Sequence, residues 1–169
     1  MKNKSAILFV CLGNICRSPM AEAVMRQMIA HEGLTDSLSV DSAGTGDWHI
    51  GRPPHEGTQG ELNKHGVSFA GMKARQVTES DFDSFQYIVA MDTKNLADVK
   101  KLRKDREIGG LLERGAHVRL FTFMELLPHH GIMDVPDPYY EGNFPYVYEL
   151  VEEGCRELLR MIKADLKSV

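Results

Sequence analysis

The sequence contains few cysteines, a single tryptophan, no long hydrophobic run and no long run of basic residues. Cys11, Cys16 and Cys155 are odd in number and too few for a disulfide framework. Together with scattered histidines they are also too few and too widely spaced for a zinc site. We therefore expect no metal and no cofactor, and we interpret these cysteines as free thiols in a reducing compartment.

The missing apolar and basic runs also limit the partners of the chain. No stretch reaches the length of a membrane span, and the N-terminus lacks the apolar core and cleavage site of a signal peptide. The net charge of −4 argues against a nucleic-acid binder held by phosphate attraction. We expect a cytoplasmic protein with neither membrane nor nucleic-acid partners, either a monomer or a weak dimer. Its 169 residues suit one domain, 1–169, with a sizeable core.

Apolar periodicity and turn residues predict strands that alternate with helices. Strands are predicted at 6–10, 38–42, 85–91 and 117–121, with loops at 43–54 and 108–115. Helices are predicted at 18–31, from Pro53-Pro54 to about 65 despite two glycines, from Thr93 onward, and from 144 or 145 to the end, where Cys155 lies on the core stripe. Residues 123–143 are mostly irregular. This alternation predicts an α/β fold with a parallel sheet, helices on both faces, and a ligand site beyond the carboxyl ends of the strands.

The most informative stretch lies where the first predicted strand ends. A short loop begins at Cys11 and ends at Arg17, and Ser18-Pro19 opens a helix. Such a loop directs backbone N–H groups at one point beside the positive end of the helix dipole, a place for an anion. The same field favours the thiolate form of Cys11, which is the attacking form. Arg17 offers two parallel N–H donors to a phosphate.

Several of these residues also have ordinary structural interpretations. Cys11 is alternatively a small buried residue at a strand end. Ser18 is a candidate N-cap whose hydroxyl we also expect to hydrogen-bond the Cys11 sulfur. Gly13 suits a sharp bend, and Asn14 either braces the loop with its side chain or tolerates left-handed geometry.

Residues 10–22, Val-Cys-Leu-Gly-Asn-Ile-Cys-Arg-Ser-Pro-Met-Ala-Glu, closely resemble the signature of the low-molecular-weight protein tyrosine phosphatases. Asp137-Pro138-Tyr139-Tyr140 matches that family's second motif. The resemblance extends over nearly the whole chain through Asp41-Ser42-Ala43-Gly44, Trp48, Gly51-Arg52-Pro53, Ala74-Arg75-Gln76 and Met91-Asp92. It implies a flavodoxin-like four-stranded parallel sheet in the order 2-1-3-4. It also implies a metal-independent phosphatase that hydrolyses phosphotyrosine in proteins, and small aryl phosphates, through a cysteinyl-phosphate.

This chemistry requires a nucleophile, a cradle for the phosphate and a proton donor. Cys11 would attack phosphorus in line, and Arg17 would stabilise the growing charge. The phosphate oxygens would be bound by N–H groups of the loop residues Leu12, Gly13, Asn14, Ile15, Cys16 and Ser18. A carboxylic acid on another segment must protonate the leaving phenolate. Asp134 and Asp137 both qualify by residue type, and the family motif favours Asp137 as acid and then as base.

Aromatic residues could form the walls of the substrate crevice. Trp48, Tyr139 and Tyr140 are candidates, although ordinary packing is an alternative for each. Ile15 is apolar where the related phosphoarginine phosphatases carry threonine, which favours phosphotyrosine as the substrate.

Residues around the loop are expected to support it. Ser42 and Asp92 resemble family residues that brace Asn14 and the loop, and Asp92 is alternatively a helix cap. Family members often have a second histidine after the one matched by His65. Here the segment after His65 reads Ala-Gly-Met-Lys at 70–73 and is one residue longer than in those family members. The support of Asp92 by a histidine is therefore expected to differ from the family pattern.

The remaining cysteine of the loop suggests redox control. Cys16 could trap an oxidised Cys11 as a reversible disulfide, or it could be a small loop side chain without such a role. The other histidines, including His129-His130, are interpreted as solvated surface residues.

Two other classes of protein use a similar first loop. Thiol-based arsenate reductases also relay oxidation through a mid-chain cysteine pair, but residues 66–100 contain no cysteine. A sugar-transport phosphocarrier would not need both Arg17 and Asp137. Turnover of p-nitrophenyl phosphate without added metal distinguishes a phosphatase from a carrier.

Overall fold

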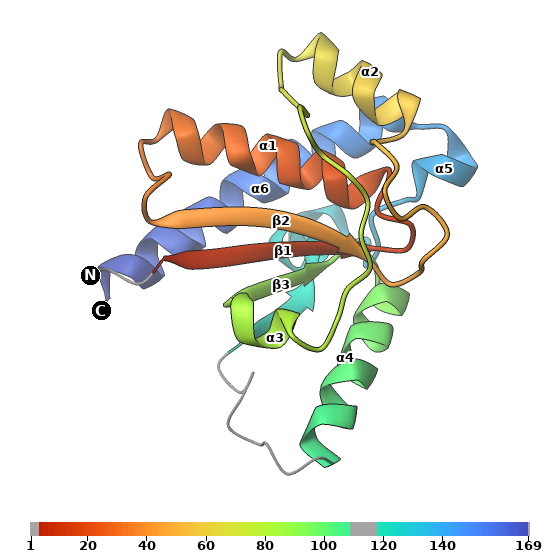
Figure 1. Ribbon diagram of the computed structural model, residues 1–169. Coiled ribbons are helices and arrows are strands. Elements are labelled where there is room, and N and C mark those ends of the chain that lie inside the picture. Colours follow the sequence, from red (N-terminus) through yellow and green to blue (C-terminus); the bar gives the residue numbers. More distant parts are fainter. Residues whose placement is uncertain (1–3, 109–117, 169) are drawn as a thin grey trace.

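The computed structural model describes residues 4–108 and 118–168, and the side chains of all of these except 104–108. Its elements alternate between strands and helices (Figure 1). They are β1 Ser5–Cys11, α1 Arg17–His31, β2 Leu38–Gly44, α2 Glu56–Lys64, α3 Asp81–Ser84, β3 Tyr87–Ala90, α4 Thr93–Ile108, β4 Arg119–Thr122, the 3₁₀ turns η1 Phe123–Leu126 and η2 Pro128–His130, α5 Pro138–Glu141 and α6 Phe144–Lys167. None of the described helices is long and apolar enough to cross a membrane.

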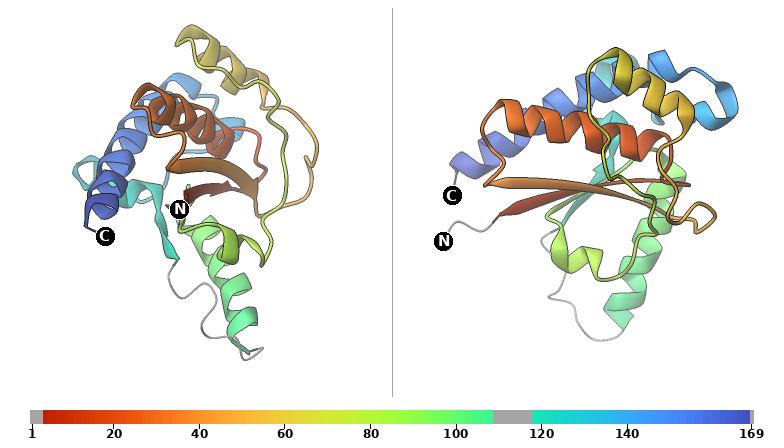
Figure 2. Two further views of the ribbon diagram at one scale, coloured as in Figure 1. Left: turned by 60° about the vertical axis from the view of Figure 1, so that its left-hand side comes forward. Right: turned by 45° about the horizontal axis from the view of Figure 1, so that its top comes forward.

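The four strands form one parallel sheet in the order β2-β1-β3-β4. The predicted α/β fold and the strand order 2-1-3-4 are therefore confirmed. Helices α1 and α6 cover one face, with α2 packed outside them, and α3 and α4 cover the other face (Figures 1 and 2). A hydrophobic core lies on each face of the sheet, and alternate residues of β1 point into them. Ile7 and Phe9 belong to one core, and Leu8 and Val10 belong to the other. Because the strand is buried on both faces, it is continuously apolar.

Some element boundaries differ from the prediction. The short helix α3 was not predicted, and because Phe85 ends it, β3 begins only at Tyr87. Helix α2 begins at Glu56, after the two prolines, because Nδ1 of His55 accepts the N–H of Gly57 at 3.0 Å and caps the helix. Residues 109–115 of the predicted loop, and the predicted strand start at 117, lie outside the described residues.

The glycine at position 57 has a packing role that its helix propensity does not reveal. A Cβ atom there would lie 2.4 Å from the ring of Phe144. The glycine therefore allows the start of α6 to pack against α2. As predicted, Cys155 lies on the buried stripe of α6. The assignment of 1–169 to a single domain stays a prediction.

Candidate active site

A cavity of about 360 Å³ opens at the carboxyl end of β1. Three segments far apart in sequence form it: the loop from β1 to α1, the loop after β2, and the start of α5. Its lining includes ten of the predicted site residues and one that was not predicted, His49: Cys11, Leu12, Gly13, Ile15, Cys16, Arg17, Trp48, His49, Asp137, Tyr139 and Tyr140. The predicted ligand edge of the sheet is therefore where the cavity lies.

The sulfur of Cys11 is contacted by two residues of its own segment on the side away from the cavity. Its Sγ lies 2.9 Å from Oγ of Ser18 and accepts the backbone N–H of Asn14 at 3.3 Å. Both contacts would stabilise negative charge on sulfur, because a hydroxyl and an amide N–H can each donate to a thiolate. The alternative that Cys11 is only a core residue does not fit this geometry, since the side chain lines the cavity.

Ser18 and Asn14 lie behind the sulfur and do not line the cavity. Helix α1 begins at Arg17 with Cys16 at the N-cap position and no side-chain cap, so the predicted capping role of Ser18 was wrong. Its fully buried hydroxyl contacts the sulfur instead, as also expected. The N–H of Asn14 is directed at sulfur, and its φ of 57° is left-handed, which asparagine tolerates better than most residues.

The side chain of Asn14 joins the loop to two other segments. Its Nδ2 donates to Oγ of Ser18 at 2.8 Å and to Oγ of Ser42 at 2.9 Å, and its Oδ1 accepts the N–H of Arg75 at 3.0 Å. Ser42 in turn donates to the carboxylate of Glu22 at 2.7 Å. Both interpretations of Asn14, as a brace and as a left-handed residue, therefore hold at once.

Glu22 was not singled out from the sequence. It is buried, and this burial raises the pKa of its carboxyl, although hydrogen bonds from Ser42 and Arg26 work in the opposite direction. Its position one turn into α1 gave no signal, because a glutamate in a helix is ordinarily solvated.

Arg17 is almost fully buried and connects the loop to both acidic segments. Its Nη1 donates to Oδ2 of Asp92 at 2.8 Å and to the carbonyl of Val135 at 2.9 Å, and its Nη2 lies 3.4 Å from Oδ2 of Asp137. Burial works to lower the pKa of Arg17, but the charges of Cys11, Asp137 and Asp92 outweigh it and raise the pKa. The guanidinium is therefore a fixed cation beside the sulfur.

The two candidate acids occupy different environments. Asp137 lines the cavity and is also the N-cap of α5, where its Oδ1 accepts the N–H of Tyr139 at 3.1 Å. Asp134 accepts the N–H of Thr93 at 2.8 Å, at the start of α4, and does not line the cavity. Only Asp137 therefore combines proximity to Arg17 with access to the cavity.

Asp92 has both of the roles considered for it. Its Oδ2 accepts from Arg17, and its Oδ1 accepts the N–H of Asn95 at 2.7 Å in the first turn of α4. The longer segment 70–73 does not contribute to these contacts. Instead, Met72 and Lys73 line a small crevice together with Glu22 and Ser42, on the side of the Asn14 network.

Aromatic residues form the outer walls of the cavity. Trp48, Tyr139 and Tyr140 are exposed but line it. Gly46 allows the indole to fold back onto its own loop, since a Cβ there would lie 2.0 Å from the Trp48 ring. The unpredicted His49 lies between the loop and Tyr139, with ring centroids 6.2 Å apart. Its Nδ1 is buried without a hydrogen-bond partner among the described residues. Its place after Trp48 was the only sequence signal.

Cys16 also lines the cavity but differs from Cys11 in its electrostatics. Burial, together with the nearby charges of Cys11 and Asp137, raises the pKa of the Cys16 thiol to about 12. Cys16 is therefore a neutral thiol at physiological pH. All three cysteines are free in the structure.

Comparisons with known proteins agree with one another. The family model described as low molecular weight phosphotyrosine protein phosphatase matches residues 6–168. The low molecular weight protein-tyrosine-phosphatase YfkJ of Bacillus subtilis is 49% identical over 160 residues, covering 95% of this chain and 97% of that protein. PtpA of Staphylococcus saprophyticus, with the same description, is 43% identical and covers 94% of each chain. The crystal structure of YfkJ superposes with a TM-score of 0.86 at 44% identity, covering 96% of this chain and 97% of that one.

Proposed function

The chain belongs to the low-molecular-weight phosphotyrosine protein phosphatase family and is a protein-tyrosine-phosphatase. We propose the following roles for its own residues in the reaction. Cys11 is the nucleophile, Arg17 stabilises the transferring phosphoryl group, and Asp137 is the general acid and base. The observation that carries this assignment is the buried Arg17 guanidinium. Arg17 ends the loop that begins at Cys11, and its guanidinium also contacts Asp137, which is distant in sequence.

In the first step, the Cys11 thiolate attacks phosphorus in line. A sulfur–phosphorus bond forms while the bond from phosphorus to the phenolic oxygen breaks, and Asp137 donates its proton to that oxygen. Backbone N–H groups of the loop and the Arg17 guanidinium bind the equatorial oxygens, whose charge grows in the transition state. The N–H of Asn14 and the hydroxyl of Ser18 stabilise the sulfur as the leaving group of the second step.

In the second step, water replaces the thiolate. Asp137, now a carboxylate, removes a proton from water, and the resulting oxygen nucleophile attacks phosphorus. The sulfur–phosphorus bond breaks, and Cys11 leaves as a thiolate together with inorganic phosphate. Each residue is thus returned to its starting protonation state.

We propose that the substrate is a phosphotyrosine side chain of a protein. The exposed rings of Trp48, Tyr139 and Tyr140 offer flat apolar surfaces to a phenyl ring. Ile15 adds an apolar side chain to the lining. An aryl ring gains from such walls, whereas a charged guanidino group would lose hydration there.

We also propose a cytoplasmic location, where thiols stay reduced, and a monomer or weak dimer. Size-exclusion chromatography with light scattering tests the oligomeric state over a range of concentrations.

A leaving-group series tests the roles of Cys11 and Asp137. Cys11→Ser should abolish turnover of every aryl phosphate. Asp137→Asn should slow phenyl phosphate by about 100-fold or more and p-nitrophenyl phosphate far less, because only a poor leaving group needs the proton. Asp134→Asn is the matched control, since that residue is a nearby exposed aspartate outside the cavity, and its series should parallel the wild type. Equal slowing of both substrates by Asp137→Asn would remove Asp137 from the acid role.

A further inference from the structure

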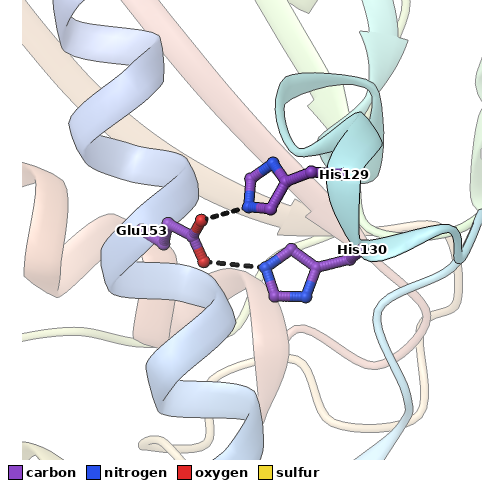
Figure 3. A group of neighbouring side chains, drawn as sticks. All are labelled: His129, His130 and Glu153. Atoms are coloured by element: carbon purple, nitrogen blue, oxygen red, sulfur yellow. Dashed lines mark hydrogen bonds and ion pairs between the residues drawn. The ribbon is translucent and has the colours of Figure 1, made fainter.

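Two adjacent histidines converge on one carboxylate outside the active site (Figure 3). His129 and His130 end the η2 turn, and Glu153 projects from α6. Nε2 of His129 lies 2.6 Å from Oε1 of Glu153, and Nε2 of His130 lies 2.8 Å from Oε2. The three ligand atoms lie within 4.8 Å of one another, and no other such group of His, Cys, Asp and Glu occurs among the described residues.

The local backbone explains how both rings reach the same point. Pro128 opens the η2 turn, and Gly131, with a φ of 68°, ends it. Consecutive side chains of a 3₁₀ turn ordinarily diverge by about 120°, yet here the ring centroids are only 4.5 Å apart. The expectation that these histidines are merely solvated is therefore incomplete, because both are engaged by Glu153.

We propose that His129, His130 and Glu153 form a binding site for a divalent transition-metal ion, with Zn²⁺ as its ligand, separate from the catalytic cavity. Two imidazoles and one carboxylate are a common zinc ligand set, and water completes the tetrahedron. The side chains of His129 and Glu153 are 62% and 38% exposed, which leaves a route for the ion and room for the water.

The existing geometry needs only small adjustments to hold the ion. Tetrahedral bonds of about 2.1 Å separate neighbouring ligand atoms by roughly 3.4 Å. One ligand atom from each of the three residues already lies within 4.8 Å of the others, so each separation must change by about 1.5 Å or less. The partly exposed side chains can make this change by small rotations. Coordination also requires that the Nε2 lone pairs face the ion, so each imidazole keeps its proton on Nδ1.

The charge of the site is suitable as well. A glutamate coordinates a metal ion as the carboxylate and a histidine as the neutral imidazole, so the three ligands together carry one negative charge. An anionic ligand beside two neutral imidazoles partly neutralises the charge of a divalent cation.

The position of the site predicts a stabilising role. The chain that follows η2 leads to Val135, whose carbonyl accepts from Arg17, and to Asp137. A cation held by η2 and α6 would therefore fasten the start of this segment to the helix. It takes no part in hydrolysis, because none of its ligands lines the cavity.

Isothermal titration with zinc chloride tests the site. We would use full-length Cys11→Ser as the background, because a thiolate is itself a zinc ligand. The expected result is one ion per chain, with affinity lowered about 10- to 100-fold or more by Glu153→Gln or His130→Ala. His129→Ala/His130→Ala should abolish binding at that site. Zinc should raise the melting temperature of the background protein but not that of the double-histidine variant.

The matched control is Glu152→Gln, which changes the neighbouring glutamate of α6, equally exposed but paired with Arg156. Its zinc affinity should equal that of the background. NMR of the histidine nitrogens should show Nε2 of both rings bound to metal. Unchanged affinity in the double-histidine variant, or no binding at millimolar zinc, would overturn the proposal. Because the readouts are zinc affinity and melting temperature and not turnover, this result is independent of the proposed catalytic roles.

Discussion

Replacement of Asn14 by alanine tests how the loop holds the sulfur. The substitution removes the three side-chain hydrogen bonds to Ser18, Ser42 and the N–H of Arg75, each contributing about 1 kcal/mol. It also places alanine at a φ of 57°, which costs about 1 kcal/mol more than for asparagine. The free energy of unfolding should therefore fall by about 4 kcal/mol, summed from these contributions.

Two further variants separate the backbone and side-chain contributions. Asn14→Gly also loses the hydrogen bonds but tolerates the left-handed backbone, so it should be about 1 kcal/mol more stable than Asn14→Ala. A double-mutant cycle of Asn14→Ala with Ser42→Ala should give a coupling of about 1 kcal/mol.

The assay is urea unfolding followed by circular dichroism, with kcat measured on the folded variants. We expect kcat to fall at least about tenfold for Asn14→Ala, because a loosened loop misplaces the sulfur. A stability loss below about 1 kcal/mol together with an unchanged kcat would refute this reasoning.

Three more predictions concern other groups. Burial raises the pKa of the Glu22 carboxyl above its ordinary value of 4.5. The protonated carboxyl therefore stabilises the folded protein below pH 4.5, and this stabilisation is lost as the pH rises through the pKa that Glu22 has in the folded protein. In urea unfolding, the free energy of unfolding of Glu22→Gln relative to that of the wild type should increase from pH 4.5 to pH 7.5. A difference between the two proteins that stays constant over this range would contradict the effect of burial. The Glu153 carboxyl has a lowered pKa, so without metal its ionised form should contribute about 0.5 kcal/mol at neutral pH after solvent screening. The stability gap to Glu153→Gln should close as the pH falls below the ordinary carboxyl range, and a gap that persists in acid would show another origin. Peroxide should convert Cys11 to a sulfenic acid that condenses with the Cys16 thiol, releasing water, and dithiothreitol should then restore the activity of the wild type. In Cys16→Ser no disulfide protects the sulfenic acid, so a second equivalent of peroxide oxidises it to the sulfinic acid and dithiothreitol should not restore activity. Irreversible loss in both proteins would exclude the trap.

The local features of the site were predictable from the chain. The apolar strand, the loop from Cys11 to Arg17 and the helix after it depend on neighbouring residues, and the structure contains them as expected. The motif around Asp137 could be matched to a family. The choice of Asp137 and not Asp134 as the general acid rested on that resemblance.

The sequence by itself determined the alternation of strands and helices and the residue types of the loop, because periodicity and turn chemistry act over a few residues. Only the tertiary structure brought Asp137 and Asp92 to Arg17, placed Glu22 behind Ser42, and turned His49 into the cavity. These contacts join segments that lie far apart along the chain. They depend on how the helices pack across the sheet, and no short-range pattern encodes that packing.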